Sequence, residues 1–422
     1  MKLNEVAENI DIFNKNGNSR NDLLLSSIDF LQNNKLPNPK NELWKYTPLT
    51  SLNGIDFSFA PTVDFKNWTI DSLNKITNIP NDTIIIPILN GKLLNELVSA
   101  NNNFTLEENK ITNLNETAKN YHSAQSVASD YFYNLNSILN QNEICLEINR
   151  NSDNLKFIFL FIAQSDTNLF ISPRLRIELQ ENVNSKIAYK FINLSQNEII
   201  SNLFTEITLK QNANLDFYIL QDKLTQFQSV NNINIIQERD SRFTSNTFTK
   251  DSKFVRNFLR IYLADENCEA NLNGLFIGNE NDLIDNHILI EHIKPNCYSN
   301  QIYKGILNDN AVGVFNGAVL VHPKAQKTNA YQSNRNILTS DSARVYTKPE
   351  LEIYADDVKC SHGEATGFVD DEMLYYMRTR GLSEENAHKL LLQAFALDVI
   401  NKFQWVDIKE SIINQIAETI EI

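Results

Sequence analysis

The sequence predicts a mainly β protein with helical regions at both ends, and two observations support this. From about Cys145 onward, short runs rich in Ile, Leu, Phe, Tyr and Val follow one another, and Asn- or Ser-containing connectors separate most of them. No long helical period is obvious before Phe368. Many short strands in succession predict a sandwich, a barrel or a β-solenoid.

The first region, residues 1–140, is expected to be mixed α/β. Between Asn21 and Leu31, apolar side chains recur at i, i+4 and i+7, which places them on one face of a helix. Pro37 and Pro39 end that helix. From Ile55 to Asn115, short β-like runs alternate with polar connectors, so the layout of this stretch stays open.

The central region, residues 141–368, is expected to form the β core. Leu175, Ile177 and Leu179 alternate with charged residues, which is the period of a strand with one buried face. Glycine is scarce, with 11 residues in 422. This argues against a chain of tight hairpins, because two-residue turns favour glycine. No exact sequence repeat is present, so periodicity alone does not establish a solenoid.

The last region, residues 369–422, returns to helix and is expected to be a small helical domain or a docking element. A helical pattern from Asp370 to Arg380 stops at Gly381, a residue type favoured just after a helix end. Ser383 then offers an N-cap for a helix that continues to about Phe403. A further short helix is expected from Asp407 to Glu418.

Composition excludes some partners. The chain has 38 Lys and Arg against 52 Asp and Glu, a net charge of −14, so it lacks the basic surface that binds nucleic acid. The longest strongly apolar run, Phe157 to Ala163, is far too short to span a bilayer. The amino terminus is acidic where a signal peptide needs an apolar run. We therefore expect a cytoplasmic protein with no membrane partner.

Several catalytic motifs are missing. The sequence contains no P-loop, no G-x-G-x-x-G, no H-E-x-x-H and no G-x-S-x-G. Four widely spaced cysteines include no C-x-x-C pair, so no motif supports a permanent iron–sulfur cluster or structural zinc held by this chain alone. Nothing in the sequence argues for catalysis, and we expect a protein that is not an enzyme.

The most informative stretch runs from Pro349 to Gly363. In an extended strand, Cys360, His362 and Glu364 project from one face and offer a thiol, an imidazole and a carboxylate. The first two are ligands suited to iron or zinc. Spacing alone favours the structural alternative, in which Cys360 is buried and His362 is hydrogen-bonded.

Other polar and aromatic residues carry weaker signals. His287 and His292 are an odd number of positions apart, so in one regular strand they face opposite ways and do not form a joint metal site. Trp44 and Tyr46 follow a Pro-rich connector and are more typical of packing anchors than of a binding surface.

The same stretch resembles the signature of the SufD family, scaffold components of the SUF iron–sulfur cluster assembly system. Specific motif matches cover roughly the last third of the chain, and the rest of the chain has fewer of them. Its elements are Pro349–Gly363, Tyr303-Lys304-Gly305, Gly313–Gly317, His322-Pro323, Ala325–Thr328, Gln332–Asn336, Asp370-Asp371-Glu372, Arg378–Gly381 and Trp44–Pro48. After Gly363 the sequence departs from the family pattern, which leaves any role for Glu364 open.

The resemblance implies a right-handed parallel β-helix core with helical N-terminal and C-terminal regions. It also implies pairing with SufB through the β-helices, and a SufC ATPase docked on the C-terminal helical domain. His362 matches a family histidine at the SufB-facing interface, a candidate metal ligand, and Cys360 matches its neighbouring cysteine. These two residues would hold a transient iron–sulfur cluster shared with SufB; no stable cofactor is expected. A homodimer of the isolated chain is compatible with the resemblance, and the sequence leaves the choice between homodimer and heterodimer open.

Two alternatives remain open at this point. A β-solenoid enzyme acting on carbohydrate is one, although such enzymes are commonly secreted and this sequence shows no signal peptide. A SufB-like protein is the other, but its cluster-building cysteine would have to lie in the core.

Overall fold

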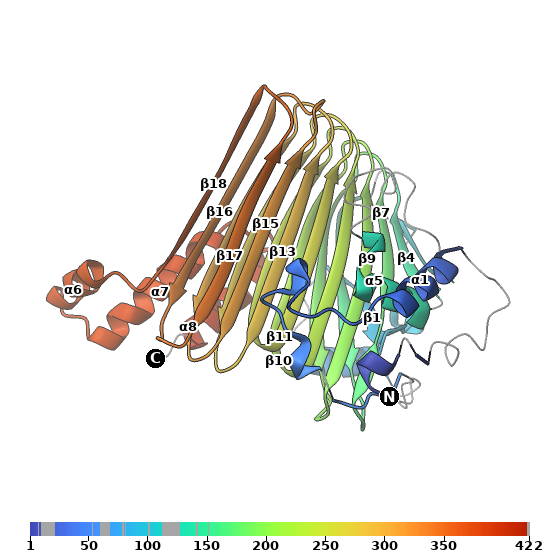
Figure 1. Ribbon diagram of the computed structural model, residues 1–422, viewed down its shortest axis with the longest axis horizontal. Coiled ribbons are helices and arrows are strands. Elements are labelled where there is room, and N and C mark those ends of the chain that lie inside the picture. The colour runs from blue at the N-terminus through green and yellow to red at the C-terminus, as the bar shows by residue number, and fades with distance from the viewer. Residues whose placement is uncertain are drawn as a thin grey trace.

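Two stacks of parallel strands form the core of the computed structural model, a β-solenoid of about eight turns (Figure 1). The structure describes residues 1–6, 8–9, 22–52, 54–59, 68–77, 80, 82–99, 102–111, 127–140, 142–150 and 152–419. Strands make up 49% and helices 21%. The prediction of a mainly β protein with a parallel β-helix core and helices at both ends is confirmed.

Each stack takes one strand, or half of a long strand, from each turn. The first stack contains β1 (Ile84–Leu89), β5 (Asp153–Ala163), β8 (Asn184–Asn193), β12 (Glu269–Gly278), β14 (Tyr298–Leu307), β16 (Thr328–Leu338) and β18 (Val358–Gly367). The second contains β4 (Asn142–Ile148), β6 (Leu169–Ile171), β7 (Arg174–Leu179), β9 (Ile199–Leu209), β13 (Leu283–His292), β15 (Val312–Val321) and β17 (Arg344–Ile353). The long strands β10 (Asn214–Gln237) and β11 (Arg242–Leu263) contribute their first halves to the first stack and their second halves to the second.

Asparagine and aspartate let the chain turn at one corner of successive turns. Asn182, Asn212, Asp240, Asn267 and Asn296 all have φ between 57° and 61°. The backbone N–H of each donates to a carbonyl of the next turn, at 2.9–3.4 Å. Short polar side chains tolerate this left-handed conformation better than other non-glycine residues. A solenoid with few glycines is therefore feasible, and the corners repeat every 27 to 30 residues.

The interior between the stacks is a continuous apolar core. Side chains at alternate positions of each strand point inward, among them Phe157, Phe159 and Phe161 of β5. Tyr189 packs edge-on against Phe161 and Phe217 from the neighbouring turns, with ring centroids 5.1 and 4.7 Å apart. Each turn is thus held by contacts with the turns above and below it.

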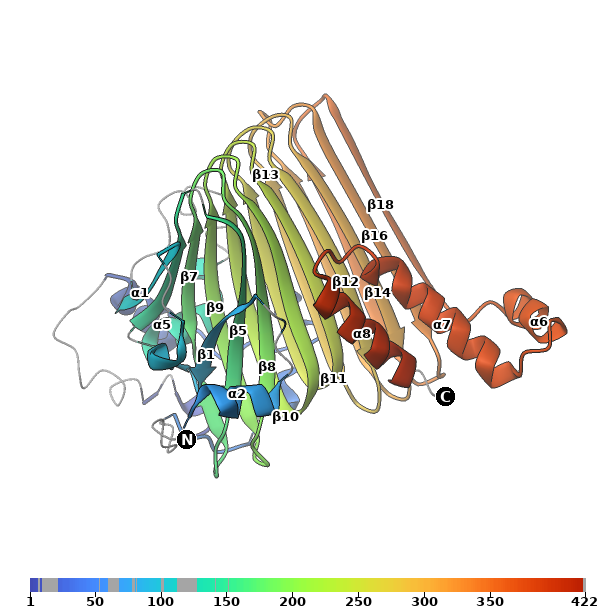
Figure 2. The ribbon, with the colours of Figure 1, turned by 180° about the vertical axis from the view of Figure 1, so that it is seen from behind.

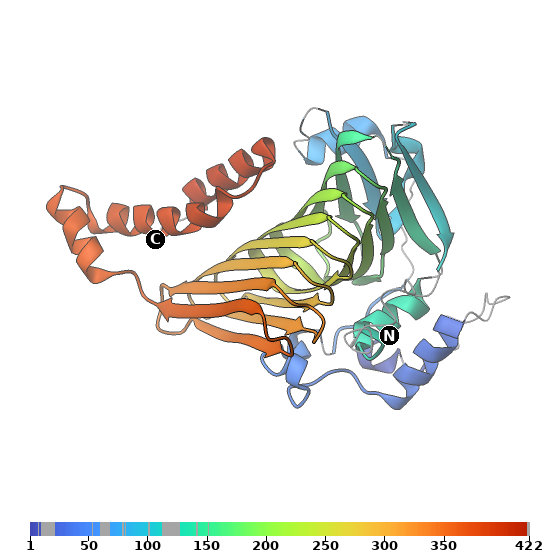
Figure 3. The same cartoon turned by 90° about the horizontal axis from the view of Figure 1, so that it is seen from above.

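N-terminal segments cover the outer face of the second stack (Figure 3). They include helices α1 (Asp22–Asn33) and α5 (Tyr131–Leu139) and short 3-10 helices at Leu3–Glu5, Glu42–Trp44 and Leu49–Ser51. The buried Trp44 ring stacks on Phe132 of α5, with ring centroids 5.2 Å apart, so Trp44 is the packing anchor that the sequence predicted. Asn21, the predicted start of the first helix, lies outside the described residues, as do residues 112–115 of the expected α/β stretch.

The same region also extends the solenoid at its N-terminal end. β2 (Lys92–Leu93) pairs antiparallel with β1, and β3 (Phe104–Lys110) pairs antiparallel with β4. Helix α2 (Ile70–Ile76) and a 3-10 helix at Asn95–Leu97 lie beside these strands. These are the two antiparallel pairs among the named strands of the described chain, which fits the argument against successive hairpins.

Two of the three C-terminal helices, α7 and α8, cover the outer face of the first stack, whereas α6 extends away from it (Figure 2). α6 is Asp371–Thr379, α7 is Glu384–Ile400 and α8 is Val406–Thr419. Ser383 caps α7 by accepting a hydrogen bond from the Asn386 N–H, and Gly381 has a φ of 92°, so both predicted boundaries are confirmed. Residues 420–422 lie outside the described range. No helix in the described part is long and apolar enough to cross a membrane.

One side chain fixes the turn between α7 and α8 to the solenoid. The hydroxyl of Tyr218, on β10, accepts hydrogen bonds from the backbone N–H groups of Gln404 and Trp405 at 3.1 and 2.9 Å. The Trp405 indole packs edge-on against the same ring. The last helices are therefore held by polar as well as apolar contacts.

We predict that Tyr218→Phe lowers the free energy of unfolding by about 1–3 kcal/mol, because it leaves the buried N–H of Trp405 and the partly buried N–H of Gln404 without this acceptor. Urea denaturation measures this change. Tyr354→Phe, at a ring that is 62% exposed, is the matched control and should be neutral. Equal stability of the two variants would contradict the proposed anchor.

Candidate functional site at the open end of the solenoid

The last turn of the solenoid is uncovered. β17 pairs with β15 and β18 pairs with β16, and no strand of the described chain continues either ladder outward. Both strands lie at the end of the stack away from helices α1 and α5 (Figure 1). Their outer backbone N–H and C=O groups form a free edge of the kind that pairs with another β structure.

Cys360, His362 and Glu364 all project from one face of β18, as the alternation predicted. They stand in register with Ala330, Gln332 and Asn334 of β16, whose side chains are buried inside the solenoid. The three residues therefore occupy interior-facing positions on a turn whose outer edge pairs with no strand of the described chain. Cys360 packs partly against the apolar core, whereas His362 and Glu364 are exposed.

Glu364 ties the two last strands together. Its carboxylate accepts a short hydrogen bond from the hydroxyl of Thr347 on β17. Sequence reasoning did not single out Thr347, because nothing local links residues that lie 17 positions apart on opposite stacks. The contact gives Glu364 a bracing role at the end of the solenoid. The exposed imidazole of His362 makes no hydrogen bond to another described residue.

At neutral pH the thiol of Cys360 is a weaker metal ligand than the thiol of a cysteine in solution. Burial raises its pKa, and a hydrogen bond with the backbone of Ala330 offsets only part of that effect. A thiol must lose its proton to bind a metal ion, so a raised pKa lowers its metal affinity near neutrality. The four cysteines are free thiols; Cys268 and Cys297 are buried.

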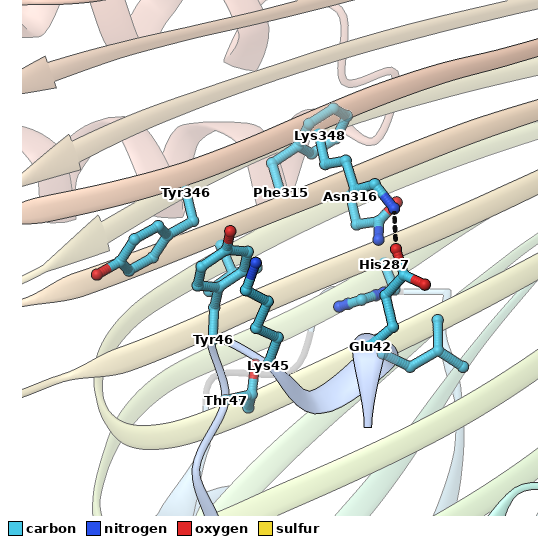
Figure 4. Close-up of a pocket in the computed structure, with 11 residues that line it drawn as sticks. Glu42, Lys45, Tyr46, Thr47, His287, Phe315, Asn316, Tyr346 and Lys348 are labelled. Carbon is cyan, nitrogen blue, oxygen red and sulfur yellow. Dashed lines mark hydrogen bonds and ion pairs between the residues drawn. The ribbon is translucent and has the colours of Figure 1, made fainter. Parts of the chain in front are cut away.

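A pocket of about 80 Å³ lies elsewhere, where the N-terminal segment crosses the outer face of the second stack. Lys45, Tyr46 and Thr47 line it from one side, and His287 and Asn316 from the other (Figure 4). The Tyr46 ring stacks on Tyr346 with centroids 4.2 Å apart, and Lys348 bonds Glu42 at 2.7 Å across the mouth. These contacts hold the segment down, as expected for packing anchors.

A buried ion cluster lies beneath that pocket. The Asp285 carboxylate contacts the Arg256 guanidinium and the Thr47 hydroxyl, and lies 2.9 Å from His287 Nε2. Burial alone would raise the pKa of Asp285, but Arg256 and His287 outweigh it and the pKa lies below its ordinary value. Burial and Arg256 lower the pKa of His287, which stays neutral at pH 7. The arrangement is that of a satisfied structural cluster.

His292 faces the other way, as predicted. Its Nε2 lies 2.8 Å from the Ser299 hydroxyl inside the solenoid, and burial lowers its pKa to about 3. His287 and His292 therefore do not converge. Among the described residues, no group of three or more His, Cys, Asp or Glu side chains is placed to hold a metal ion by itself.

The fold and this end define a β-solenoid protein with an open, donor-bearing last turn. The family model for the SufBD core domain of the SUF iron–sulfur cluster assembly system matches residues 161–395. This segment is more than half of the chain.

Individual relatives extend the similarity beyond that core. The chain is 26% identical to the iron–sulfur cluster assembly protein SufD of Escherichia coli, over 96% of this chain and 95% of the relative. It is 29% identical to a SufBD family iron–sulfur cluster assembly protein of Synechocystis, over 89% of this chain and 86% of the relative. The chain belongs to the SufBD family, and the predicted SufD-type iron–sulfur cluster assembly protein is confirmed. The carbohydrate-active alternative has no support among these relatives.

We predict that Cys360 reacts slowly with iodoacetamide at pH 8 and that its rate keeps rising above pH 9, because a raised pKa leaves less thiolate at each lower pH. Mass spectrometry of a Cys145→Ser background, in which the other partly exposed thiol is removed, measures this rate. Cys360→Ser is the control for assignment. A rate that levels off below about pH 8.5, the ordinary cysteine value, would contradict the burial effect.

Proposed function

We propose that this chain is a non-catalytic scaffold subunit that pairs with a SufB homologue and docks a SufC-type ATPase during iron–sulfur cluster assembly. The observation that carries the proposal is the uncovered last turn, which combines a free β edge with two soft metal donors on one strand. Membership of the SufBD family indicates that the cargo is an iron–sulfur cluster. A cytoplasmic location remains a prediction.

The free edge supports the choice of partner. A strand edge offers a row of donors and acceptors that another parallel or antiparallel strand satisfies. A second β-solenoid presents such an edge at the same spacing between strands, so two solenoids join end to end without rearranging either core. A SufB homologue is the partner that the family resemblance names. In its absence the same edges pair with a second copy, which gives the homodimer expected of the isolated chain.

The position of His362 supports a metal role. An imidazole at an interior-facing position of the last turn is held by the strand and is exposed at the open end. A partner that covers this end brings its own donors to the same place. The chain contributes His362 to a transient cluster shared with SufB. It also contributes Cys360, whose thiol must first lose its proton and does so less readily than a free cysteine. No stable cofactor on this chain alone is proposed, in agreement with its two isolated donors.

Helix α6 supports the ATPase-docking role. None of its side chains is buried, and Met373, Tyr375 and Tyr376 are 54–70% exposed. Large apolar and aromatic side chains at this exposure are typical of a surface that another protein covers. Figure 2 shows α6 extending beyond the solenoid, which leaves it accessible.

We predict that His362→Ala lowers iron–sulfur cluster output in cells by roughly tenfold or more, as expected when a metal site loses an essential contact. The activity of an iron–sulfur reporter enzyme, in cells that carry only the variant, measures this effect. The melting temperature should not change, because His362 is exposed and packs against no core cluster.

Ser361→Ala is the matched control. Ser361 precedes His362 on the same strand and faces the opposite side, so it tests the edge without touching the donor. Normal cluster output from His362→Ala, or an equal loss from both variants, would refute the role of His362.

We also predict that replacing Tyr375 and Tyr376 together with alanine weakens binding of the SufC homologue by roughly tenfold or more, since aromatic anchors dominate interface energies. Co-purification and calorimetry measure the loss. Leu194→Ala removes another exposed apolar side chain, following β8, and should leave binding unchanged. Binding that survives the double substitution would place the ATPase elsewhere.

A further inference from the structure

A column of polar side chains runs inward from His362. The inter-strand registers align Gln301 of β14 with Gln332 of β16, and Gln332 with His362 of β18. Gln301 is 0% exposed and Gln332 is 4% exposed. The next position inward is Leu272 of β12, so the polar column starts at Gln301 and ends at the open turn.

Neither glutamine amide has a hydrogen-bond partner among the described residues, at its nitrogen or at its oxygen. Burying an amide without a partner destabilises a protein, so such groups are uncommon in native cores. An apolar side chain of similar size would be more stable at both positions. The two amides therefore indicate that a hydrogen-bond partner arrives in another state of the protein.

Space in the interior accommodates the deeper amide. Gly317 of β15 faces Gln301 across the solenoid, and a Cβ built at Gly317 would lie 2.9 Å from the Gln301 Oε1 atom. Gln301 therefore extends across the interior toward the second stack. Gln332, one turn further out, has the open turn of His362 beside it. Residues in register on neighbouring strands lie about 4.8 Å apart, a distance that a glutamine side chain bridges easily.

The chemistry of metal-bound histidine supplies the missing partner. When one imidazole nitrogen binds a metal ion, the other carries a proton and usually donates it to a carbonyl or carboxylate oxygen. This hydrogen bond fixes the ring orientation and selects the nitrogen that faces the metal. A glutamine Oε1 atom is such an acceptor.

We propose that Gln332 is the positioning residue of His362: its Oε1 atom accepts the ring N–H of His362 when the other ring nitrogen binds iron at the open turn. The inference rests on the metal role proposed for His362 above. Gln332 does not touch the metal. It orients the imidazole and receives the partner that its buried amide lacks in the free chain.

The test compares Gln332→Met, Gln301→Met, Gln332→Glu and His362→Ala in the full chain, co-purified with the SufB and SufC homologues of the same organism. Methionine fills a similar volume but accepts hydrogen bonds only weakly, whereas glutamate keeps an acceptor oxygen at the same place. Iron and acid-labile sulfide bound after reconstitution with ferrous iron and sulfide are the readout. The melting temperature of each free chain is measured beside them.

We expect Gln332→Met to lose roughly tenfold or more in cluster loading at unchanged or higher melting temperature. Gln301→Met should stay within about twofold of the parent chain, because Gln301 lies one turn too deep to reach the ring. Gln332→Glu should recover most of the loss. A purely structural glutamine would show the opposite: lower stability and no rescue by glutamate.

Three outcomes overturn the inference. Cluster loading by Gln332→Met near the parent value refutes a positioning role, provided that His362→Ala is impaired in the same assay. Equal losses in the two methionine variants show a general effect of the interior column. Normal loading by His362→Ala refutes the metal role itself and the inference with it, so the two failures are distinguishable.

Discussion

The backbone hydrogen bonds between successive turns are the interaction on which the rest of this structure depends. Each inner turn satisfies its N–H and C=O groups through the turn before and the turn after, and the Asn and Asp corners carry the ladder around the bend. Apolar side chains of neighbouring turns then stack in register, which makes the core continuous. This arrangement is stable in its middle and incomplete at its ends. The N-terminal segments complete one end and the open turn is left at the other.

The strand content and the helix boundaries of this fold were accessible from the sequence, whereas the solenoid itself was reached through the family resemblance. Alternation in β7 and the caps at Ser383 and Gly381 are local signals, and local signals survive in a single sequence. The repeat of the turns is a property of the backbone geometry, and Asn212 and Asp240 both adopt it. In the sequence this repeat is visible as Asn and Asp residues 27 to 30 positions apart. The left-handed φ that makes these residues corners cannot be read from the sequence.

The candidate site divides in the same way. Period-2 alternation placed Cys360 and His362 on one face, and the structure agrees. Alternation does not say which face looks inward, or that β18 is the last strand of its stack. It also cannot link His362 to Gln332, 30 residues earlier, or Glu364 to Thr347 on the opposite stack. Those relationships come from the register between turns, which is set by the whole ladder.

The position of the donors follows from the same ladder. Inside a solenoid, an inward-facing side chain is held firmly, but neither a metal ion nor a partner protein can reach it. On its flanks, a side chain is accessible but has few neighbours to orient it. The last turn gives an inward-facing position that has a buried neighbour in register and is open to a second protein. A donor at His362 meets these conditions, and the cost of leaving that turn uncovered in the free chain is offset when a partner extends the ladder.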